Sequence, residues 1–264
     1  MNDLDDQAKK LWQARTTGTQ CEPFSSELTI SDAYDLQSAC IRHAPNNNKI
    51  IGYKIGATVS EVLDMLSLDE PFYGAMYESD LHQAVGSTPL DLPLFVQHQP
   101  RIEAEIAVCM KSDLTNTGQE ISLDEVQAAV DWVSPGLEIV ASRCETPEDK
   151  RGLFAIADFG ANQHMVLGSP FSKWQELDLT AHAISININD ETAVEGHSGM
   201  SIFGNPLQFV RWLVNHPSRR NVPLKAGEIV SCGTCTGALP IRGNDVVKAH
   251  FGLLGSLQLN IVAR

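Results

Sequence analysis

The clearest periodic pattern in the chain runs from Arg101 to Met110. Apolar side chains occupy every second position of this segment, and the positions between them include Arg101, Glu103 and Glu105. A period of two is typical of a β-strand with one face on a hydrophobic core. Because a strand rises about 3.3 Å per residue, the two glutamates would project from one face, roughly 7 Å apart along the backbone.

Two interpretations of this glutamate pair follow from the pattern. An antiparallel strand can expose one polar face to water, and Glu103 and Glu105 would then simply be solvated. Alternatively, carboxylates held this close repel each other unless a cation separates them, and carboxylate oxygens are the ligands that hard divalent cations prefer. The strand alone leaves both interpretations open.

Helices are predicted at five places. Two of them cover residues 3–16 and 58–67. Two more begin at capping boxes, Thr29-Ile-Ser-Asp32 and Ser122-Leu-Asp-Glu125, in which the first side chain and the acid three residues later satisfy each other's backbone amides. The fifth begins at Asn205, which precedes a proline, a residue favoured at the first helical position.

Many short strands complete the pattern. We expect Ser134-Pro135-Gly136 to stop the helix that begins at Ser122. Because strands outnumber helices without regular βαβ alternation, the sequence predicts an α+β fold. A turn-rich stretch over residues 83–97 suggests a division into a mostly helical region, 1–85, and a β-rich region, 86–264. Strands are predicted over residues 50–56, 101–110, 137–140, 182–189, 229–232, 246–251 and 257–262.

Charge and composition restrict the kinds of partner that the protein can bind. The chain has 33 acidic and 19 basic residues, a net charge of −14, whereas nucleic acids and anionic membranes select basic surfaces. No apolar run approaches the roughly 20 residues of a membrane-spanning helix, and the acidic amino terminus lacks the features of a signal peptide. We therefore expect a cytoplasmic protein with reduced thiols, in which Cys232-Gly-Thr-Cys235 alone does not indicate a zinc site.

Three further charged residues occupy positions of interest. Lys54 stands between Gly52 and Gly56 on one face of a predicted strand, where a ligand could approach the backbone, although an exposed lysine near a hairpin fits the same pattern. Glu138 lies near the start of a short apolar strand, where an unpaired buried charge is costly. Asp158, taken in isolation, is typical of a turn.

No single sequence motif indicates a function, but several short segments taken together do. No Gly-x-Gly-x-x-Gly, P-loop or Gly-x-Ser-x-Gly pattern occurs, so neither a nucleotide cofactor nor a serine hydrolase is indicated. The informative segments are Gly52-Tyr-Lys-Ile-Gly56, Asp69-Glu-Pro71 with Gly74, Glu103-Ala-Glu-Ile-Ala107, Glu138-Ile-Val140, Ser142-Arg143, Ile156-Ala-Asp158, Val166-Leu-Gly168, Gly204-Asn-Pro206, Thr236-Gly237 and Phe251-Gly-Leu-Leu-Gly-Ser256. In this order, and over nearly the whole chain, they resemble the 2-keto-4-pentenoate hydratase family, which is related to 4-oxalocrotonate decarboxylases and to the fumarylacetoacetate hydrolase fold.

The resemblance implies a metal site and its substrate. A Mg²⁺ or Mn²⁺ ion would be held by Glu103, Glu105 and Glu138. It would bind a small anionic 2-oxo or 2-hydroxy-dienoic acid and stabilise its enolate as a Lewis acid. Lys54 matches the family's lysine beside the substrate, where it would transfer a proton or orient a carboxylate. The other site residues implied are Asp158, as a catalytic group, and Arg143 and Thr236, as substrate-binding groups.

The resemblance also implies a fold and an activity. The fold would be a fumarylacetoacetate-hydrolase-like mixed β roll or sandwich with a smaller, mostly helical N-terminal region, assembled as a homo-oligomer. The activity would be that of a metal-dependent hydro-lyase of aromatic-compound catabolism, which hydrates a 2-hydroxy-2,4-dienoate to a 4-hydroxy-2-oxo acid. The alternatives are a 4-oxalocrotonate-type 2-oxo acid decarboxylase, an acylpyruvate C–C hydrolase, and a non-enzymatic, partner-binding subunit whose chemistry has drifted.

Three departures from the family's pattern bear on the reaction. Phe72 stands where hydratases usually carry an aspartate implicated in proton handling, and decarboxylases tend to carry an apolar residue there. Ala141 replaces the aspartate of an Asp-Ser-Arg motif, and Phe159-Gly-Ala161 replaces Asn-Ala-Ser. The segments Thr236-Gly-Ala238 and Phe251–Gly255 are closer to the hydratase branch. Hydration is therefore the leading hypothesis and decarboxylation the second.

Overall fold

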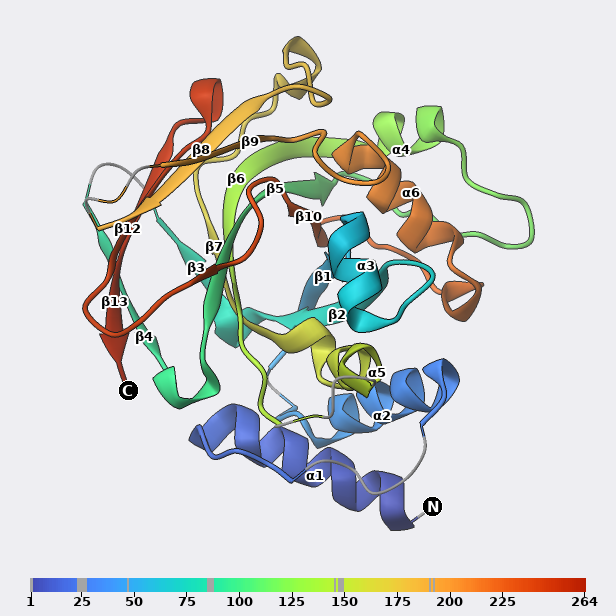
Figure 1. Cartoon of the computed structure of the whole chain (residues 1–264). Helices are drawn as coiled ribbons and strands as arrows, with labels where there is room; N and C mark the ends of the chain where they lie inside the picture. Colours follow the sequence, from blue (N-terminus) through green and yellow to red (C-terminus); the bar gives the residue numbers. More distant parts are fainter. Residues whose placement is uncertain are drawn as a thin grey trace.

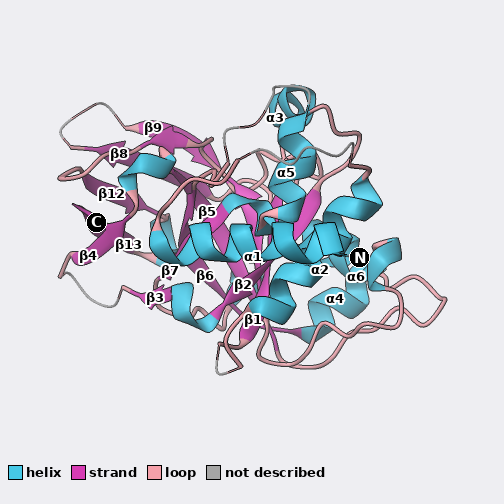
Figure 2. Cartoon of the chain, turned by 90° about the horizontal axis from the view of Figure 1, so that it is seen from below, coloured by secondary structure: helices cyan, strands magenta, loops and turns pink. Residues whose placement is uncertain are grey.

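The computed structural model combines two β-sheets with helices packed around them (Figures 1 and 2). Its described residues contain thirteen strands and six α-helices, which confirms the predicted mixture of many short strands with few helices. Among them, no helix is long and apolar enough to cross a membrane. The described residues are 2–22, 28–46, 48–84, 88–144, 146, 150–189, 191 and 193–264.

The larger sheet has eight strands. In spatial order they are β2 (Phe72–Tyr77), β1 (Ile50–Gly56), β10 (Ile229–Thr234), β5 (Arg101–Met110), β6 (Val130–Val140), β7 (Asn162–Leu167) and β3 (Leu81–Gln83), with β11 (Leu239–Pro240) paired to β5. β1 pairs with β10 and β3 with β7 in parallel, and the other pairs are antiparallel. This order places strands from the front, middle and end of the chain side by side.

The smaller sheet packs against one face of the larger one. Its strands, in order, are β4 (Leu90–Leu94), β13 (Ser256–Ala263), β12 (Val246–His250), β8 (Ala183–Ile188) and β9 (Val194–His197). The alternating apolar residues of β5, from Ile102 to Met110, are at most 1% exposed and belong to the core that also includes Ile186, Val247 and Leu259. The predicted strand and its core face are therefore confirmed.

The helices cover the remaining surfaces. They are α1 (Asn2–Thr17), α2 (Ile30–His43), α3 (Ser60–Leu66), α4 (Leu123–Ala129), α5 (Arg151–Ala157) and α6 (Pro206–Asn215). Both predicted capping boxes, at Thr29 and Ser122, are present, and the Asn205 side chain caps α6. The helices α1, α2 and α5 lie together at the bottom of Figure 1, where Leu11 and Leu36 share a second core with residues of α5.

One predicted boundary is wrong. α4 ends earlier than expected, and β6 continues without a break through Ser134-Pro135-Gly136, the predicted stop. Val130 and Val133, which were expected on the helix, are buried in the core from a strand between β5 and β7, so packing outweighs the helical period. Pro135 lacks an N–H, but it lies where pairing with β7 ends and its carbonyl accepts the Gly168 N–H at 2.9 Å.

The division expected near residue 85 stays a prediction. Residues 1–85 contain the helices α1, α2 and α3, together with the strands β1, β2 and β3. All three of these strands belong to the larger sheet, and β1 pairs directly with β10 from the end of the chain. The front of the chain therefore contributes to the same sheet as β5 and β6.

The structure contains one disulfide, between Cys21 and Cys144, so the expectation of reduced thiols is wrong for this pair. The two cysteines are 123 residues apart, and their spacing carries no signal. They meet because the segment after α1 forms a parallel bridge with the segment after β6, in which the Cys21 N–H donates to the Arg143 carbonyl at 2.9 Å. Cys232 and Cys235 are buried free thiols.

Candidate active site

Four neighbouring strands of the larger sheet direct polar side chains to one face. Lys54 in β1 is in register with Ser231 in β10, and Glu103 in β5 lies directly opposite Glu138 in β6. Residues directly opposite each other in a sheet project from the same face, and the two-residue period adds Glu105 to that face. The strand order therefore gathers these five residues, although they span residues 54 to 231 of the sequence.

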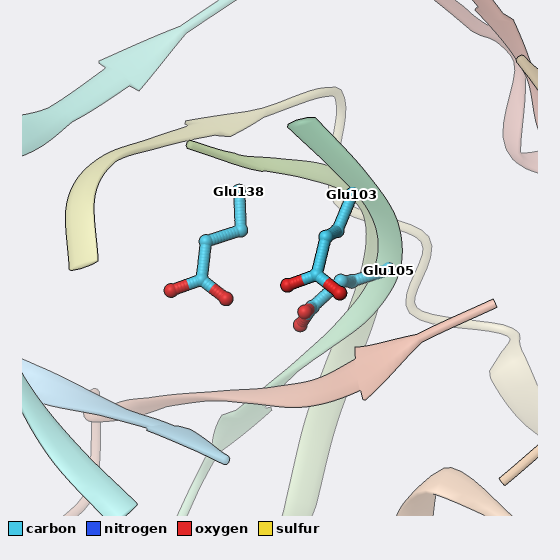
Figure 3. A group of neighbouring side chains, drawn as sticks. All are labelled: Glu103, Glu105 and Glu138. Carbon is cyan, nitrogen blue, oxygen red and sulfur yellow. The ribbon is translucent and has the colours of Figure 1, made fainter. Parts of the chain in front are cut away.

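The three glutamates converge at this point (Figure 3). Each offers a carboxylate oxygen, and these oxygens lie within 4.8 Å of one another. Glu105 and Glu138 are fully buried and Glu103 is partly exposed, so the interpretation of a solvated strand face is wrong. Burial and repulsion from Glu138 raise the pKa of Glu103 to about 7, and burial with repulsion from both neighbours raises the pKa of Glu105 well above its usual value.

Hydrogen bonds orient two of these carboxylates. Glu105 Oε2 accepts a short hydrogen bond from Ser231 Oγ and a second from the Gly233 N–H at 3.0 Å. Glu138 Oε1 accepts a hydrogen bond from Asn162 Nδ2 at 2.8 Å. Glu105 Oε1, however, is buried without a hydrogen-bond partner among the described residues. Buried carboxylate oxygens normally have a hydrogen-bond partner, so the unpartnered oxygen indicates that the site is incomplete.

Lys54 is buried beside the glutamates, which excludes the interpretation of an exposed lysine. Its side chain is 3% exposed, and Nζ lies 3.0 Å from Glu138 Oε2 and donates to the Gly160 carbonyl at 3.1 Å. Burial disfavours the charged ammonium, but attraction to Glu138, Glu103 and Glu105 outweighs burial and raises the pKa of Lys54. The lysine is therefore a cation held against the group of carboxylates.

Glycines make space for this lysine and for its neighbours. At Gly160, with a φ of +70°, a Cβ would lie 2.4 Å from Lys54 Cδ, so a side chain there would displace the lysine. The room predicted around Gly52 and Gly56 is filled by the protein itself. A Cβ on Gly52 would lie 1.8 Å from the Ile229 carbonyl oxygen, and one on Gly56 would lie 2.3 Å from the Phe72 ring.

Arg143 and Asp158 form a buried ion pair behind the glutamates. Arg143 Nη1 donates to Asp158 Oδ1 at 2.9 Å, and Nη2 donates to the Asn162 carbonyl at 2.5 Å. Burial raises the pKa of Asp158, although Arg143 opposes this shift. Because the Asn162 side chain in turn contacts Glu138, the arginine is connected to the glutamates through one residue. Arg143 is 1% exposed and is not among the described residues that line the adjoining cavity.

The structure also places Thr236 away from the cavity. Its hydroxyl donates to the Gly237 carbonyl and accepts from the Ala104 N–H. Thr234 lines the cavity instead, and its hydrogen bond lowers the pKa of Glu103 against the upward shift from burial. The pairing of β10 with β5 shifts by one residue between Ser231 and Thr234, and this shift turns Thr234 to the face of Ser231 and the glutamates, whereas Thr236 lies beyond the end of β10.

A cavity of about 800 Å³ opens beside the glutamates. Its polar end contains Glu103, Lys54 and Asp158, and Arg101 and His98 also line it. The remaining wall is mostly apolar, and Phe72 is part of it, with its ring 5.9 Å from Lys54 Nζ. The apolar residues on this wall include Val59, Val62, Met65, Leu66, Phe72, Phe154 and Ala155.

Sequence reasoning missed the residues that orient the carboxylates. Asn162 follows the turn after Asp158 and begins β7, and no sequence signal indicated its contact with Glu138. Ser231 and the Gly233 amide carried none, because their role depends on β10 pairing with β5, 126 and 128 residues away from Glu105. Long-range strand pairing cannot be derived from a local pattern.

The sequence matches the family model described as fumarylacetoacetate (FAA) hydrolase C-terminal over residues 42–262. The 2-keto-4-pentenoate hydratase of Paraburkholderia xenovorans is 32% identical over 258 residues, which cover 96% of this chain and 93% of that protein. The 2-hydroxyhexa-2,4-dienoate hydratase of Comamonas testosteroni is 30% identical over 246 residues, which cover 92% of this chain and 91% of that protein. These alignments include every strand that contributes to the group of glutamates.

A solved structure shares the whole architecture. The 4-oxalocrotonate decarboxylase from Pseudomonas putida G7, complexed with magnesium and adipate, matches with a TM-score of 0.87 at 25% identity, covering 99% of this chain and 98% of that one. A likeness over this length extends to both sheets and to the helices around them. The mixed β architecture expected from the resemblance is thus confirmed.

Proposed function

Because this chain belongs to the fumarylacetoacetate hydrolase family, we propose that it is a metal-dependent hydro-lyase that hydrates 2-hydroxy-2,4-dienoates to 4-hydroxy-2-oxo acids in the breakdown of aromatic compounds. The observation that carries this proposal is the group of three carboxylates and a lysine at one end of a cavity. The relatives named above support the hydration reaction. The substrate would be a small anionic 2-hydroxy-dienoic acid.

We assign Glu103, Glu105 and Glu138 as the ligands of Mg²⁺ or Mn²⁺. The fit rests on three oxygen donors within 4.8 Å, on the unpartnered Glu105 Oε1, and on the repulsion that raises the pKa of Glu103 and of Glu105. When bound, the ion supplies Lewis-acid stabilisation of the negative charge that develops on the 2-oxygen of the substrate.

Lys54 is the residue best placed to handle a proton at the substrate. One contact of Nζ is to Glu138 and another to the Gly160 carbonyl, so the ammonium is fixed in position. The raised pKa keeps Nζ protonated in the metal-free protein, which suits it to orient the substrate carboxylate; a bound cation would lower this pKa and bring Nζ nearer to the range in which a lysine transfers protons. Either role requires the lysine to face the cavity, which it lines.

Asp158 is the second candidate for proton transfer. It lines the cavity, and because its pKa is raised, its carboxylate takes up a proton more readily than that of an exposed aspartate. Arg143 holds its carboxylate at 2.9 Å, so we propose that this arginine positions Asp158 and Asn162 rather than binding substrate. The substrate-binding role expected for Thr236 falls to Thr234 in this proposal, because Thr234 lines the cavity.

Decarboxylation of a 4-oxalocrotonate-type acid is the second candidate. One observation favours it: Phe72, 4% exposed, lies against Lys54 where hydratases carry an aspartate. An apolar side chain excludes water from that part of the wall, which suits loss of carbon dioxide better than addition of water. Both reactions need the same stabilisation of negative charge, so the glutamates are shared by the two candidates.

An assay with two substrates distinguishes the candidates. The protein, loaded with Mg²⁺ or Mn²⁺, is incubated separately with 2-hydroxypenta-2,4-dienoate and with 4-oxalocrotonate. We expect the dienoate absorbance to fall and 4-hydroxy-2-oxopentanoate to form. Carbon dioxide release from 4-oxalocrotonate without hydration of the dienoate would instead establish the decarboxylase. The matched control is Glu105→Gln, which removes one proposed ligand and should abolish either reaction.

Assembly and location are further parts of the proposal. We propose a homo-oligomer, as the family resemblance implies, and a cytoplasmic location, in which the Cys21–Cys144 disulfide would have to persist under reducing conditions. Light scattering and size-exclusion chromatography would test the first, and cell fractionation would test the second.

A further inference from the structure

The cavity is larger than the proposed core substrate needs. Its volume of about 800 Å³ lies in the range of pockets that enclose drug-sized ligands. A five-carbon 2-oxo acid held at Glu103 and Lys54 would fill only the polar end. Residues of α3 and α5 line the space that remains. The side chains of these two helices would therefore determine which ligand group binds there.

Helix α3 presents apolar side chains to the cavity without burying them. None of its residues is buried, although Val62, Met65 and Leu66 all line the cavity. Met65 is 55% exposed, which is unusual for a large apolar side chain. Figure 2 shows α3 standing out from the rest of the molecule, beyond α5. The helix therefore offers apolar surface that a ligand in the cavity would cover.

Helix α5 closes the other side of this space. A Cβ on Gly152 would lie 2.4 Å from the Leu66 carbonyl oxygen, so the glycine allows α5 to approach the end of α3. Phe154 and Ala155 of α5 line the cavity opposite the polar groups of the sheet. The two helices thus form a continuous apolar wall that leads away from the proposed metal site.

We propose that this wall is a subsite for an apolar chain at the distal end of the substrate. The proposal rests on the proposed function, which places the 2-oxo acid at Glu103 and Lys54. A hydrocarbon chain fits because it would cover Val62, Met65 and Leu66, whose exposed apolar surface is then removed from water. The enzyme would therefore act on 2-hydroxy-2,4-dienoates that carry an alkyl substituent at the distal end.

A distal carboxylate is the competing occupant, because Arg151 begins α5 and also lines the cavity. Arg151 is exposed and already takes part in another interaction. A carboxylate directed there would leave the apolar residues of α3 uncovered. The composition of the wall therefore favours the alkyl chain.

Calorimetric binding of stable 2-oxo acids tests the subsite without relying on turnover. The Mn²⁺-loaded protein is titrated with 2-oxopentanoate, 2-oxohexanoate and 2-oxooctanoate, and with 2-oxoadipate, which differs from 2-oxohexanoate by a distal carboxylate. We expect Kd to fall about fourfold for each methylene that is fully buried. A Kd that is independent of chain length, the absence of any binding, or tighter binding of 2-oxoadipate that Arg151→Gln abolishes would overturn the proposal.

Variants of α3 test whether this helix causes the dependence of Kd on chain length. Val62→Thr and Met65→Gln keep the approximate size of the side chain and make it polar, so each should reduce the gain with chain length and leave the Kd of 2-oxopentanoate unchanged. Asp64→Asn, an exposed position on the same helix outside the cavity lining, is the matched control. If Kd depends on the length of the alkyl chain but no dienoate is hydrated, the subsite is supported and the proposed reaction is wrong. Equal effects of all three variants on Kd would overturn the subsite.

Discussion

The metal-free protein should lose stability as the pH rises. Burial raises the pKa of Glu103 from 4.5 to about 7 and raises that of Glu105 well above its usual value. A carboxyl with a higher pKa in the folded than in the unfolded chain stabilises the fold while it is protonated. This stabilisation is complete below pH 4.5 and is lost as the pH rises to about 7. Glu103 then carries a negative charge close to the other two carboxyl groups.

The magnitude follows from the shift at Glu103. A rise from pKa 4.5 to about 7 corresponds to about 3 kcal/mol, at about 1.4 kcal/mol per pH unit. Because Glu103 is partly exposed, solvent screening makes this value an upper limit. Lys54 stays charged over the whole range, since its pKa is raised above 10.5. His164, whose pKa burial lowers to about 4, opposes the trend below pH 6.5.

Comparison with Glu103→Gln cancels the contribution of His164 and of other groups. Urea unfolding in EDTA, followed by the fluorescence of the four tryptophans, gives the free energy of unfolding from pH 5 to pH 8. The wild-type protein should lose more stability than the variant over this range. Mg²⁺ or Mn²⁺ should stabilise the wild type more at pH 8 than at pH 5, because fewer protons compete for the ligands. An equal pH dependence in the two proteins would refute the reasoning.

Four further predictions concern single side chains. Glu105→Gln should weaken Mn²⁺ binding more than tenfold in a calorimetric titration, because one of three charged ligands is lost. Lys54→Met should lower kcat about 100-fold or more while Mn²⁺ still binds, since general acid catalysis contributes at least that factor. Replacing Cys21 and Cys144 by serine should lower the free energy of unfolding by up to about 5 kcal/mol in urea, because the disulfide closes a 123-residue loop. Phe72→Asp should raise the rate of hydration relative to decarboxylation in the two-substrate assay, since a carboxylate beside Lys54 can carry a proton.

Part of the site follows from local sequence alone. The period of two in β5 predicts that Glu103 and Glu105 share a face, because successive side chains of a strand alternate. The third proposed ligand could not be derived in this way. Glu138 lies opposite Glu103 only because β6 pairs with β5 in one register, and that register depends on packing along the whole strand. Resemblance to a family supplied Glu138, and the structure supplies the physical reason.

Other features depend on irregularities that the sequence does not signal. The irregular pairing of β10 near Gly233, with a φ of +87°, turns Thr234 to the face of the glutamates, and Thr236 lies beyond the end of that strand. Cys21 and Cys144 are brought together by a bridge between two segments without regular secondary structure of their own. In both cases the position of a side chain is set by long-range backbone geometry, to which a local pattern is insensitive.

The wall of the cavity, rather than the glutamates, must decide the reaction. Hydration and decarboxylation both develop negative charge on the same oxygen, and the three carboxylates serve either one. Water addition further needs a group that moves a proton near the distal carbon, and Phe72 cannot supply one. Among the described lining residues, the groups left for this task are Lys54, Asp158 and His98. Burial lowers the pKa of His98, so it is neutral near pH 7, whereas Lys54 is charged and fixed by two contacts. A hydratase with this wall would therefore have Lys54, Asp158 and the neutral His98 as its candidates for proton transfer, and Asp158 directly follows α5.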